Sequence, residues 1–435
     1  MFKAGWMHLS PIVFVFARSF IDGCEIYLIL PTAWYYMKSI GQTERYLAVV
    51  LIAFNVAAVV MTPLFGLVGD RLGHVKLLII TSFMMKVLGN MFYCIREFPV
   101  FPLLGRVLAG MGDGSNGLVF RYVALNTSKD ERVKMFVLLD GAYCLGSSFG
   151  PAIGSVITFK ATFMGLKIDA GNSPGIILFC VWSVFLVWSF FLPGNLDEKV
   201  VSDHVDSLVS SDCAKHDETI TEKYMTQNRE VTNKKWQHCN SEVVCLFYLI
   251  FCSEFFSSTA FFSTPLLAEE VLKLKLIHIK LYFLNSSLLN FVFFTATYIA
   301  SNRFDERRIV TFFITIQIIA LSLLTSLALT WTHFSYIQYY ILLFYVTLGS
   351  PYIIFVLSCS LLSKFTDPKN AGLFQGISLA TVHSSIVISQ ILASFVFTQT
   401  GMVYFSVCLI FLWLFGAVWY AFAFENSSKK MRMLR

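Results

Sequence analysis

Ionisable side chains interrupt several long apolar runs of this sequence, and they are the residues there that could bind a proton or a charged solute. The first run, 8–33, contains Arg18, Asp22 and Glu25 at positions i, i+4 and i+7, a spacing that places all three on one face of a helix. A charged side chain at bilayer depth costs about 2.5–3.5 kcal/mol on insertion scales, so each is a functional candidate. Arg18 and Asp22 can form an internal pair, which leaves Glu25 as the better proton carrier.

A second group of charges lies in the third and fourth apolar runs. Two glycines lie between Arg106 and Asp113, and such small residues allow neighbouring helices to approach closely. Arg121 follows near the end of the same run. Lys86 lies in the middle of the other run and can meet either an anion or one of the carboxyl groups.

These charges also have purely structural interpretations. Arg106 can pair with Asp113 or with Asp22, and Arg121 is near enough to a helix end to extend its head group to water. His383, in a late run, can carry a proton or simply form a hydrogen bond. The sequence predicts that one cavity holds an anion on Arg106, Arg121 and Lys86 and couples protons through Glu25, Asp22 and Asp113.

The composition indicates what kind of chain positions these groups. Hydrophobic residues make up 56% and charged residues 14% of the 435 positions, with a mean hydropathy of +0.68, whereas a soluble domain has about 25% charged residues. The chain is therefore predicted to be an all-α membrane protein with twelve transmembrane helices of about 20 residues each. We expect these spans at 8–33, 46–69, 77–95, 100–123, 133–158, 174–193, 242–266, 276–300, 309–330, 336–362, 371–397 and 401–424.

The chain divides at its one long polar segment. Residues 195–241 lack an apolar period and are rich in Ser, Asp, Lys and Thr, which is typical of a flexible linker. They separate a six-helix bundle at 1–194 from a second at 242–425, and 426–435 forms a tail. Basic residues are concentrated in the segments that place both termini in the cytoplasm. Landmarks recur 234 or 235 residues apart, as expected for two pseudo-symmetric bundles around a central site: Pro31 and Pro265, Asp70 and Asp305, Gly141 and Gly376.

The same sequence argues against several other functions. It contains no nucleophile motif or phosphate-binding loop ahead of a soluble domain, so we expect no enzyme and no cofactor. The net charge of +6 is explained by the orientation of the spans and requires no nucleic acid. One Cys/His group in the polar linker has irregular spacing for zinc, so we expect no metal site at Cys213, His216, His238 and Cys239.

The turn between the second and third runs carries a dense pattern. Residues 66–76 are Gly-Leu-Val-Gly-Asp-Arg-Leu-Gly-His-Val-Lys, with glycines where two helix ends crowd and bases that hold the loop on the inner side. This pattern is similar to the loop between helices 2 and 3 of the major facilitator superfamily. The resemblance implies that Asp70, with Arg71 and Gly73, forms a cytoplasmic gate that bonds partner helices in one conformation and releases them in the other.

Two further stretches resemble motifs of the same superfamily. Arg106 and the glycines after it look like the signature of helix 4. The segment 146–154 resembles the antiporter-associated motif of drug–proton exchangers, although Val137 and Ser155 stand where that motif has its first and last glycines.

Several short segments resemble one branch of the superfamily, that of vacuolar phosphate transporters with an SPX domain and their lysosomal relatives, including the protein defective in a childhood ceroid lipofuscinosis. These segments are 26–33, 89–93, 121–123, 301–305 and 361–364. The branch implies an inorganic anion as substrate and a lysosomal or vacuolar membrane rather than the plasma membrane. Two features depart from it: no SPX domain precedes the first span, so we expect no phosphate sensing in cis, and Val387 stands about where relatives carry an Arg.

We therefore predict a monomeric secondary active transporter in a lipid bilayer. It moves a small solute, an anion, by alternating access, and coupling of this movement to protons is one way in which it can be driven. One alternative is a proton-driven exporter of organic solutes or drugs, which the motif at 146–154 favours. The other is an anion channel or a non-transporting scaffold on the same fold.

Overall fold

Helices form most of the described chain, as expected for a chain in a lipid bilayer, whose hydrocarbon core offers the backbone no hydrogen bonds. The computed structural model describes residues 2–156, 161–163, 166–169, 171–192, 241–268, 272–274, 276–330, 336–348, 353–396 and 398–433. The first half contains α1 (Phe2–Ser39), α2 (Glu44–Leu72), α3 (Val75–Tyr93), α4 (Val100–Gly112), η1 (Asp113–Ser115), α5 (Asn116–Asn126), α6 (Lys129–Val156) and α7 (Ser173–Phe190). The second half contains α10 (Ser241–Leu266), α11 (Leu276–Ala300), α12 (Glu306–Leu329), α13 (Tyr336–Leu348), α14 (Ile353–Phe365), η3 (Pro368–Asn370), α15 (Ala371–Val396) and α16 (Gln399–Met433).

The predicted all-α fold class is confirmed. Two short strands, β1 (Ala161–Phe163) and β2 (Leu166–Ile168), form an antiparallel pair in the connection between α6 and α7. When α4 is counted with α5, and α13 with α14, the described helices are consistent with the twelve predicted spans.

Eight stretches are long and apolar enough to cross a membrane on length and composition alone, and one of them, Tyr336–Phe365, includes residues 349–352, which lie outside the described part of the chain. They are Arg45–Leu72, Val75–Tyr93, Ser173–Phe190, Ser241–Thr264, Glu306–Leu329, Tyr336–Phe365, Ala371–Leu392 and Gln399–Ala423. Helix α1 and the α4–α5 pair are not among them, and these two elements carry most of the buried charges described below.

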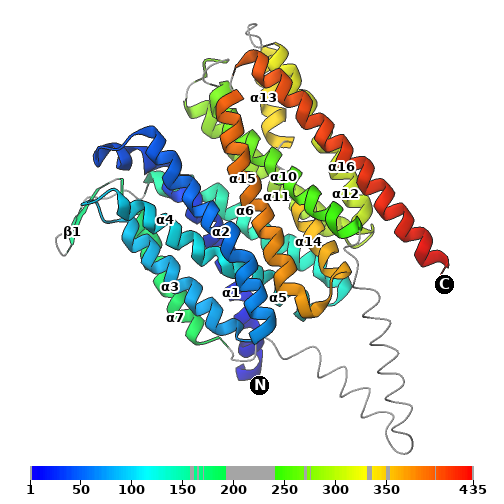
Figure 1. Cartoon of the computed structure of the whole chain (residues 1–435), viewed down its shortest axis with the longest axis horizontal. Helices are drawn as coiled ribbons and strands as arrows, with labels where there is room; N and C mark the ends of the chain where they lie inside the picture. The colour runs from blue at the N-terminus through cyan, green and yellow to red at the C-terminus, as the bar shows by residue number, and fades with distance from the viewer. Residues whose placement is uncertain are drawn as a thin grey trace, which may run out of the picture.

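The two halves of the chain lie on either side of a boundary, with the blue-to-green helices on one side and the green-to-red helices on the other (Figure 1). In the first half, α1 packs on α6, and α3 packs on α4 and α7. In the second half, α10 packs on α14, α15 and α16. The boundary is formed by α2 and α5 against α15 and by α6 against α11 and α14, so residues on these helices make the contacts between the halves.

The fourth predicted span is divided. Helix α4 ends at Gly112, the 3₁₀ turn η1 covers Asp113–Ser115, and α5 begins at Asn116. A 3₁₀ turn within a helix often marks a functional hinge. In this chain Arg106 lies before the turn, on α4, and Arg121 lies after it, on α5.

The turn between α2 and α3 depends on Gly73, which has a φ of 63° and donates its N–H to the Gly69 carbonyl at 3.1 Å. This left-handed cap favours glycine because a Cβ would be strained there. Lys76, in the first turn of α3, donates to two carbonyl oxygens at the C-terminal end of α7. We call the end of the molecule that contains this turn the hairpin end.

Candidate functional site

Lys86 on α3 lies at the centre of a buried charge cluster. Its ammonium group is 2.6 Å from Asp22 Oδ1, 2.7 Å from Glu25 Oε2 and 3.1 Å from Asp113 Oδ1, and its side chain has no exposed surface. One cation therefore joins α1, α3 and η1. Of the two partners that the sequence left open for Lys86, the structure shows the carboxyl groups.

The predicted stripe on α1 faces this cluster. Arg18 Nε lies 3.4 Å from Asp22 Oδ2, so the expected internal pair forms. The Arg18 guanidinium also donates to the Ser115 carbonyl at 3.2 Å and to the Ser115 hydroxyl at 2.8 Å. Both bonds fix α1 against the broken fourth span.

Close helix packing makes the cluster possible. A Cβ added at Gly112 would lie 2.5 Å from Lys86 Cγ and 2.7 Å from the Ser82 carbonyl oxygen, so only glycine leaves room for this lysine. Asn90, one turn after Lys86, donates to Glu25 Oε1 at 3.2 Å. The Lys86 ammonium also lies 4.3 Å from the centroid of the Trp182 ring, a favourable cation–π distance.

Arg106 on α4 differs from the other buried cations. It is 2% exposed, and its guanidinium lies 4.4 Å from the centroid of the Phe54 ring. Its Nε and Nη1 atoms are buried without a hydrogen-bond partner, and among the described residues no carboxylate lies within 4.0 Å of it. The pairing with Asp113 or Asp22 that the sequence left open is therefore absent from this conformation, and two guanidinium donors are available to an anion.

The second half of the chain reaches the cluster through His383 on α15. Its Nε2 atom lies 3.1 Å from Asp113 Oδ2, and its Nδ1 atom lies 3.0 Å from Asn55 Oδ1 on α2. Asp113 thus touches Lys86 from its own half and His383 from the other. The sequence identified His383 as a possible proton carrier but gave no sign of its partner.

The predicted gate residue Asp70 joins the two halves at the hairpin end. Its carboxylate accepts the Gly372 N–H at 3.0 Å and the Leu373 N–H at 2.7 Å, both in the first turn of α15. These N–H groups have no acceptor within the helix, and the helix N-terminus attracts negative charge. Asp70 therefore caps a helix of the opposite half.

Arg121 also belongs to this end of the molecule. Its Nε atom donates to Asp70 Oδ1 at 2.8 Å, and the Asp70 side chain is 3% exposed. The structure therefore places Arg121 at the hairpin end and does not bring it together with Arg106 and Lys86. Arg71 is exposed, while Gly73 shapes the turn, so Asp70 makes the contact between the halves.

A second contact between the halves at this end was not predicted. Arg132 on α6 donates to the Ser363 carbonyl at 3.1 Å and to the Ser363 hydroxyl at 3.2 Å. Lys364, the next residue on α14, pairs with Glu306. The acid that bonds to a neighbouring helix in the second half is thus Glu306, rather than Asp305, which the internal repeat matches to Asp70.

Two other buried carboxylates lie outside the charge cluster. Asp140 on α6 is 6% exposed and Glu254 on α10 is 5% exposed. They are near enough to interact electrostatically with each other. The electrostatic neighbour of Glu254 on α10 is therefore Asp140 on α6.

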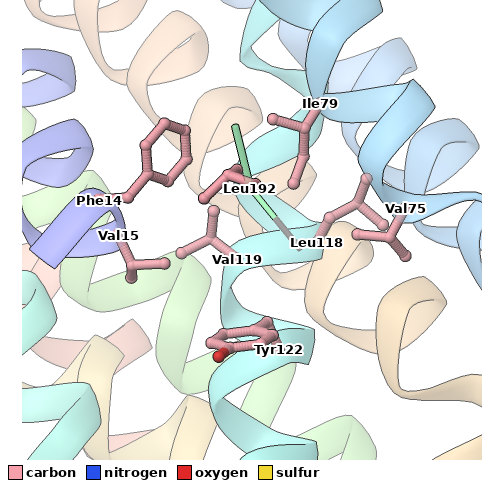
Figure 2. Close-up of a pocket in the computed structure, with 8 residues that line it drawn as sticks. All are labelled: Phe14, Val15, Val75, Ile79, Leu118, Val119, Tyr122 and Leu192. Atoms are coloured by element: carbon pink, nitrogen blue, oxygen red, sulfur yellow. The ribbon is translucent and has the colours of Figure 1, made fainter. Parts of the chain in front are cut away.

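A separate gap in the first half is apolar. Figure 2 shows its lining side chains, which come from α1, α3, α5 and the end of α7 and include no charged group. They are Phe14, Val15, Val75, Ile79, Leu118, Val119, Tyr122 and Leu192. This gap offers an anion no charge, so the buried charge cluster together with Arg106 is the better candidate for an anion site. The linker at 195–241, with its Cys/His group, lies outside the described residues except for residue 241.

These features define a class of protein: a polytopic membrane protein with two helical halves, a buried charge cluster in the first half that bonds to His383 of the second, and a carboxylate that caps a helix of the opposite half. The chain belongs to the Major Facilitator Superfamily, and the model of that family matches residues 15–388. This family membership supports membrane transport as the general function.

The curated relatives are SPX domain-containing membrane proteins of plants. One from Oryza sativa subsp. indica is 29% identical over 185 residues, which is 42% of this chain and 26% of the relative. One from Arabidopsis thaliana is 25% identical over 202 residues, which is 45% of this chain and 28% of the relative. The matches therefore span only about a quarter of the length of these relatives.

Two solved structures share the fold over nearly the whole chain. The human organic anion transporter MFSD10 (TETRAN) has a TM-score of 0.67 and 16% identity, and the match covers 94% of this chain and 99% of that one. A bacterial homologue of the iron transporter ferroportin, in an outward-facing state, has a TM-score of 0.68 and 10% identity, with 95% and 99% covered.

The Lys86 cluster yields a prediction about stability. Replacing Lys86 by Met leaves three carboxylates without their shared cation, and losing one partner of a buried pair costs about 3–5 kcal/mol. We expect a large drop in the melting temperature of the purified protein in detergent. The exposed Lys38, changed to Met, is the matched control and should melt like the wild type. Equal melting temperatures for all three proteins would contradict a central role for Lys86.

Proposed function

We propose that this protein is a secondary active transporter that moves a small anion by alternating access, with the solute held in the core by Arg106. The observation that supports this most directly is that two nitrogen atoms of the buried Arg106 guanidinium have no hydrogen-bond partner. A buried charge is normally compensated by a partner, and the other cations of the core, Arg18 and Lys86, have carboxylates within 4.0 Å. An anion between the halves would supply the missing partner.

The charge distribution around Arg106 also favours a negatively charged solute. Arg106 presents donors in a fixed fork that matches carboxylate and phosphate oxygens. The three carboxylates of the cluster are already bonded to Lys86, so they repel an anion less than free carboxylates would. Arg121 is assigned to the gate in this proposal, because its bond is with Asp70.

The gate works by capping in this proposal. Asp70 holds the first turn of α15 while the hairpin end is closed, and Arg132 on α6 holds the end of α14. Release of both contacts opens this end as the halves tilt. We assign the hairpin end to the cytoplasmic side on the excess of bases in the segments at this end, and a lysosomal or vacuolar membrane follows from the resemblance to the SPX-domain branch.

The name of one structural neighbour favours a second candidate. MFSD10 is described as an organic anion transporter, so an organic anion is the alternative to an inorganic one. Both require the same guanidinium. An anion channel on this fold differs, because it would show sustained unitary conductance in a planar bilayer.

Removal of Arg106 tests the anion site. In proteoliposomes offered phosphate, sulfate, chloride or lactate, with and without a pH gradient, we expect Arg106→Ala to lower the flux of the transported anion roughly ten- to hundredfold. This corresponds to the loss of a charge-assisted hydrogen bond worth about 1.5–3 kcal/mol. Arg106→Lys should keep part of the flux, because the charge remains but the fork is lost. The exposed Arg45, changed to Ala, is the control. Wild-type flux in Arg106→Ala would overturn the assignment.

The gate generates a separate prediction. Asp70→Asn keeps the shape of the side chain but loses its charge and one acceptor, so the contact with α15 weakens and the balance between the two conformations shifts. We expect the exchange rate to fall more than the affinity for the anion. The control is Asp305→Asn, at the position that the repeat matches to Asp70, where no side-chain cap forms. Equal losses of rate and affinity in Asp70→Asn would argue against gating.

A further inference from the structure

His383 is the one side chain of α15 that is seen bonding to the buried charge cluster. It is 6% exposed, and its two ring nitrogens lie 3.1 Å from Asp113 Oδ2 and 3.0 Å from Asn55 Oδ1. As the side chains are oriented, both neighbours present oxygen atoms, which accept hydrogen bonds. Only the imidazolium form of histidine has an N–H on both nitrogens. The geometry therefore fits the charged ring.

The charges of the cluster balance without this histidine. Arg18, Lys86 and Arg106 supply three positive charges. The negative charges are the three carboxylates of the cluster, Asp22, Glu25 and Asp113. A proton on His383 thus gives the core one net positive charge, and its removal makes the core neutral.

The excess charge lies near the candidate anion site. The Phe54 ring contacts both groups, with the Arg106 guanidinium 4.4 Å from its centroid and the His383 ring 6.3 Å away, edge on. Asp113 is bonded to Lys86 as well as to His383. Its single negative charge is therefore already offset by Lys86 and does not fully offset the imidazolium charge. An incoming anion therefore gains attraction when His383 is protonated.

Titratable groups on three helices packed against α15 have other charged neighbours. On α5 Arg121 is bonded to Asp70, and on α14 Lys364 is paired with Glu306. On α10 the neighbour of Glu254 is another carboxyl group, that of Asp140. Cys359, also on α14, lies near Asp140 and Glu254. Among the described residues, Asp113 is the only carboxylate within 4.0 Å of His383.

We propose that His383 is the proton-coupling residue of this transporter and that one proton on its ring accompanies one negative charge of the anion. This step rests on the proposed function. The imidazole takes up a proton from the open side, and the N–H then bonds to Asp113 across the boundary. When the halves tilt, α15 moves away from η1, the bond to Asp113 breaks, and the proton leaves from His383 to the other side together with the anion.

One measurement tests the titration of His383 without any solute. The melting temperature of the purified full chain is followed from about pH 5.5 to 8 in neutral detergent, where histidine changes charge. Only a ring with hydrogen on both nitrogens can donate to Asp113 and to Asn55 at the same time, so the proposal expects these two bonds to stabilise the fold at the low end of the range. We expect the wild type to lose stability over this range and His383→Gln to lose that slope. His278→Gln, a half-buried histidine of α11 outside the cluster, should keep it.

A second measurement tests the coupling. Proteoliposomes containing a pH-sensitive dye are offered sulfate, whose charge is constant over this range. We expect sulfate uptake by the wild type to fall about tenfold between the ends of the range and to carry protons. His383→Lys, which keeps a charge, should take up sulfate with a flat pH profile and without protons, and His383→Gln should be slow at every pH.

The outcomes separate the two proposals. A wild-type pH profile in His383→Gln, in both the melting and the uptake experiments, would overturn the role of His383. So would proton movement in His383→Lys. Normal sulfate uptake in Arg106→Ala, or none in the wild type, counts against the proposed function, while the melting curves still decide whether His383 titrates.

Discussion

A charge inside a membrane protein must find a partner, and this constraint determines how the first half of the chain is built. Lys86 satisfies three carboxylates at once, from α1 and from the turn η1. Arg18 fixes the same two elements through Asp22 and Ser115. The positions of α1, α3 and the fourth span are thus set by a few short contacts in a medium where an unpaired charge is costly. Close packing at Gly112 follows from the same need, because a larger residue would displace the lysine.

The two halves have different parts in this arrangement. The first half supplies the charges of the core, while the second half faces them with α15. This helix begins at the Asp70 cap and carries His383 about 16 Å further along, at 1.5 Å per residue. The contact with Asp70 and the contact with Asp113 therefore lie on one helix of the second half. In the proposed mechanism, a movement of this helix changes both contacts together.

Sequence reasoning identified the features that depend on local periodicity. The spacing of Arg18, Asp22 and Glu25 placed them on one face of a helix. The expectation that Asp70 bonds partner helices came instead from the resemblance of its glycine-rich turn to the superfamily loop, and sequence reasoning of either kind has the same limit. It could not assign partners, because periodicity defines the face of a helix but not the distance to a residue elsewhere in the chain. Arg121 and Arg106 share a predicted span, yet Arg121 bonds to Asp70, while no carboxylate of the described residues lies within 4.0 Å of Arg106.

Partners between the halves were the hardest to predict for the same reason. The bond between His383 and Asp113 joins residues far apart in the sequence, and the internal repeat matched Asp70 to Asp305 although Glu306 makes the ion pair. The repeat preserves the position of a loop but not the exact residue that faces the next helix. A one-residue shift on a helix turns a side chain by about 100°, which follows from 3.6 residues per turn. Arg106 differs from the other cations of the core, because among the described residues no carboxylate lies within 4.0 Å of it, whereas Arg18 and Lys86 each have one. Its contacts are the Phe54 ring and the longer-range attraction of Glu25 and Asp113, so the anion proposed above would be a closer partner than any carboxylate described in the chain.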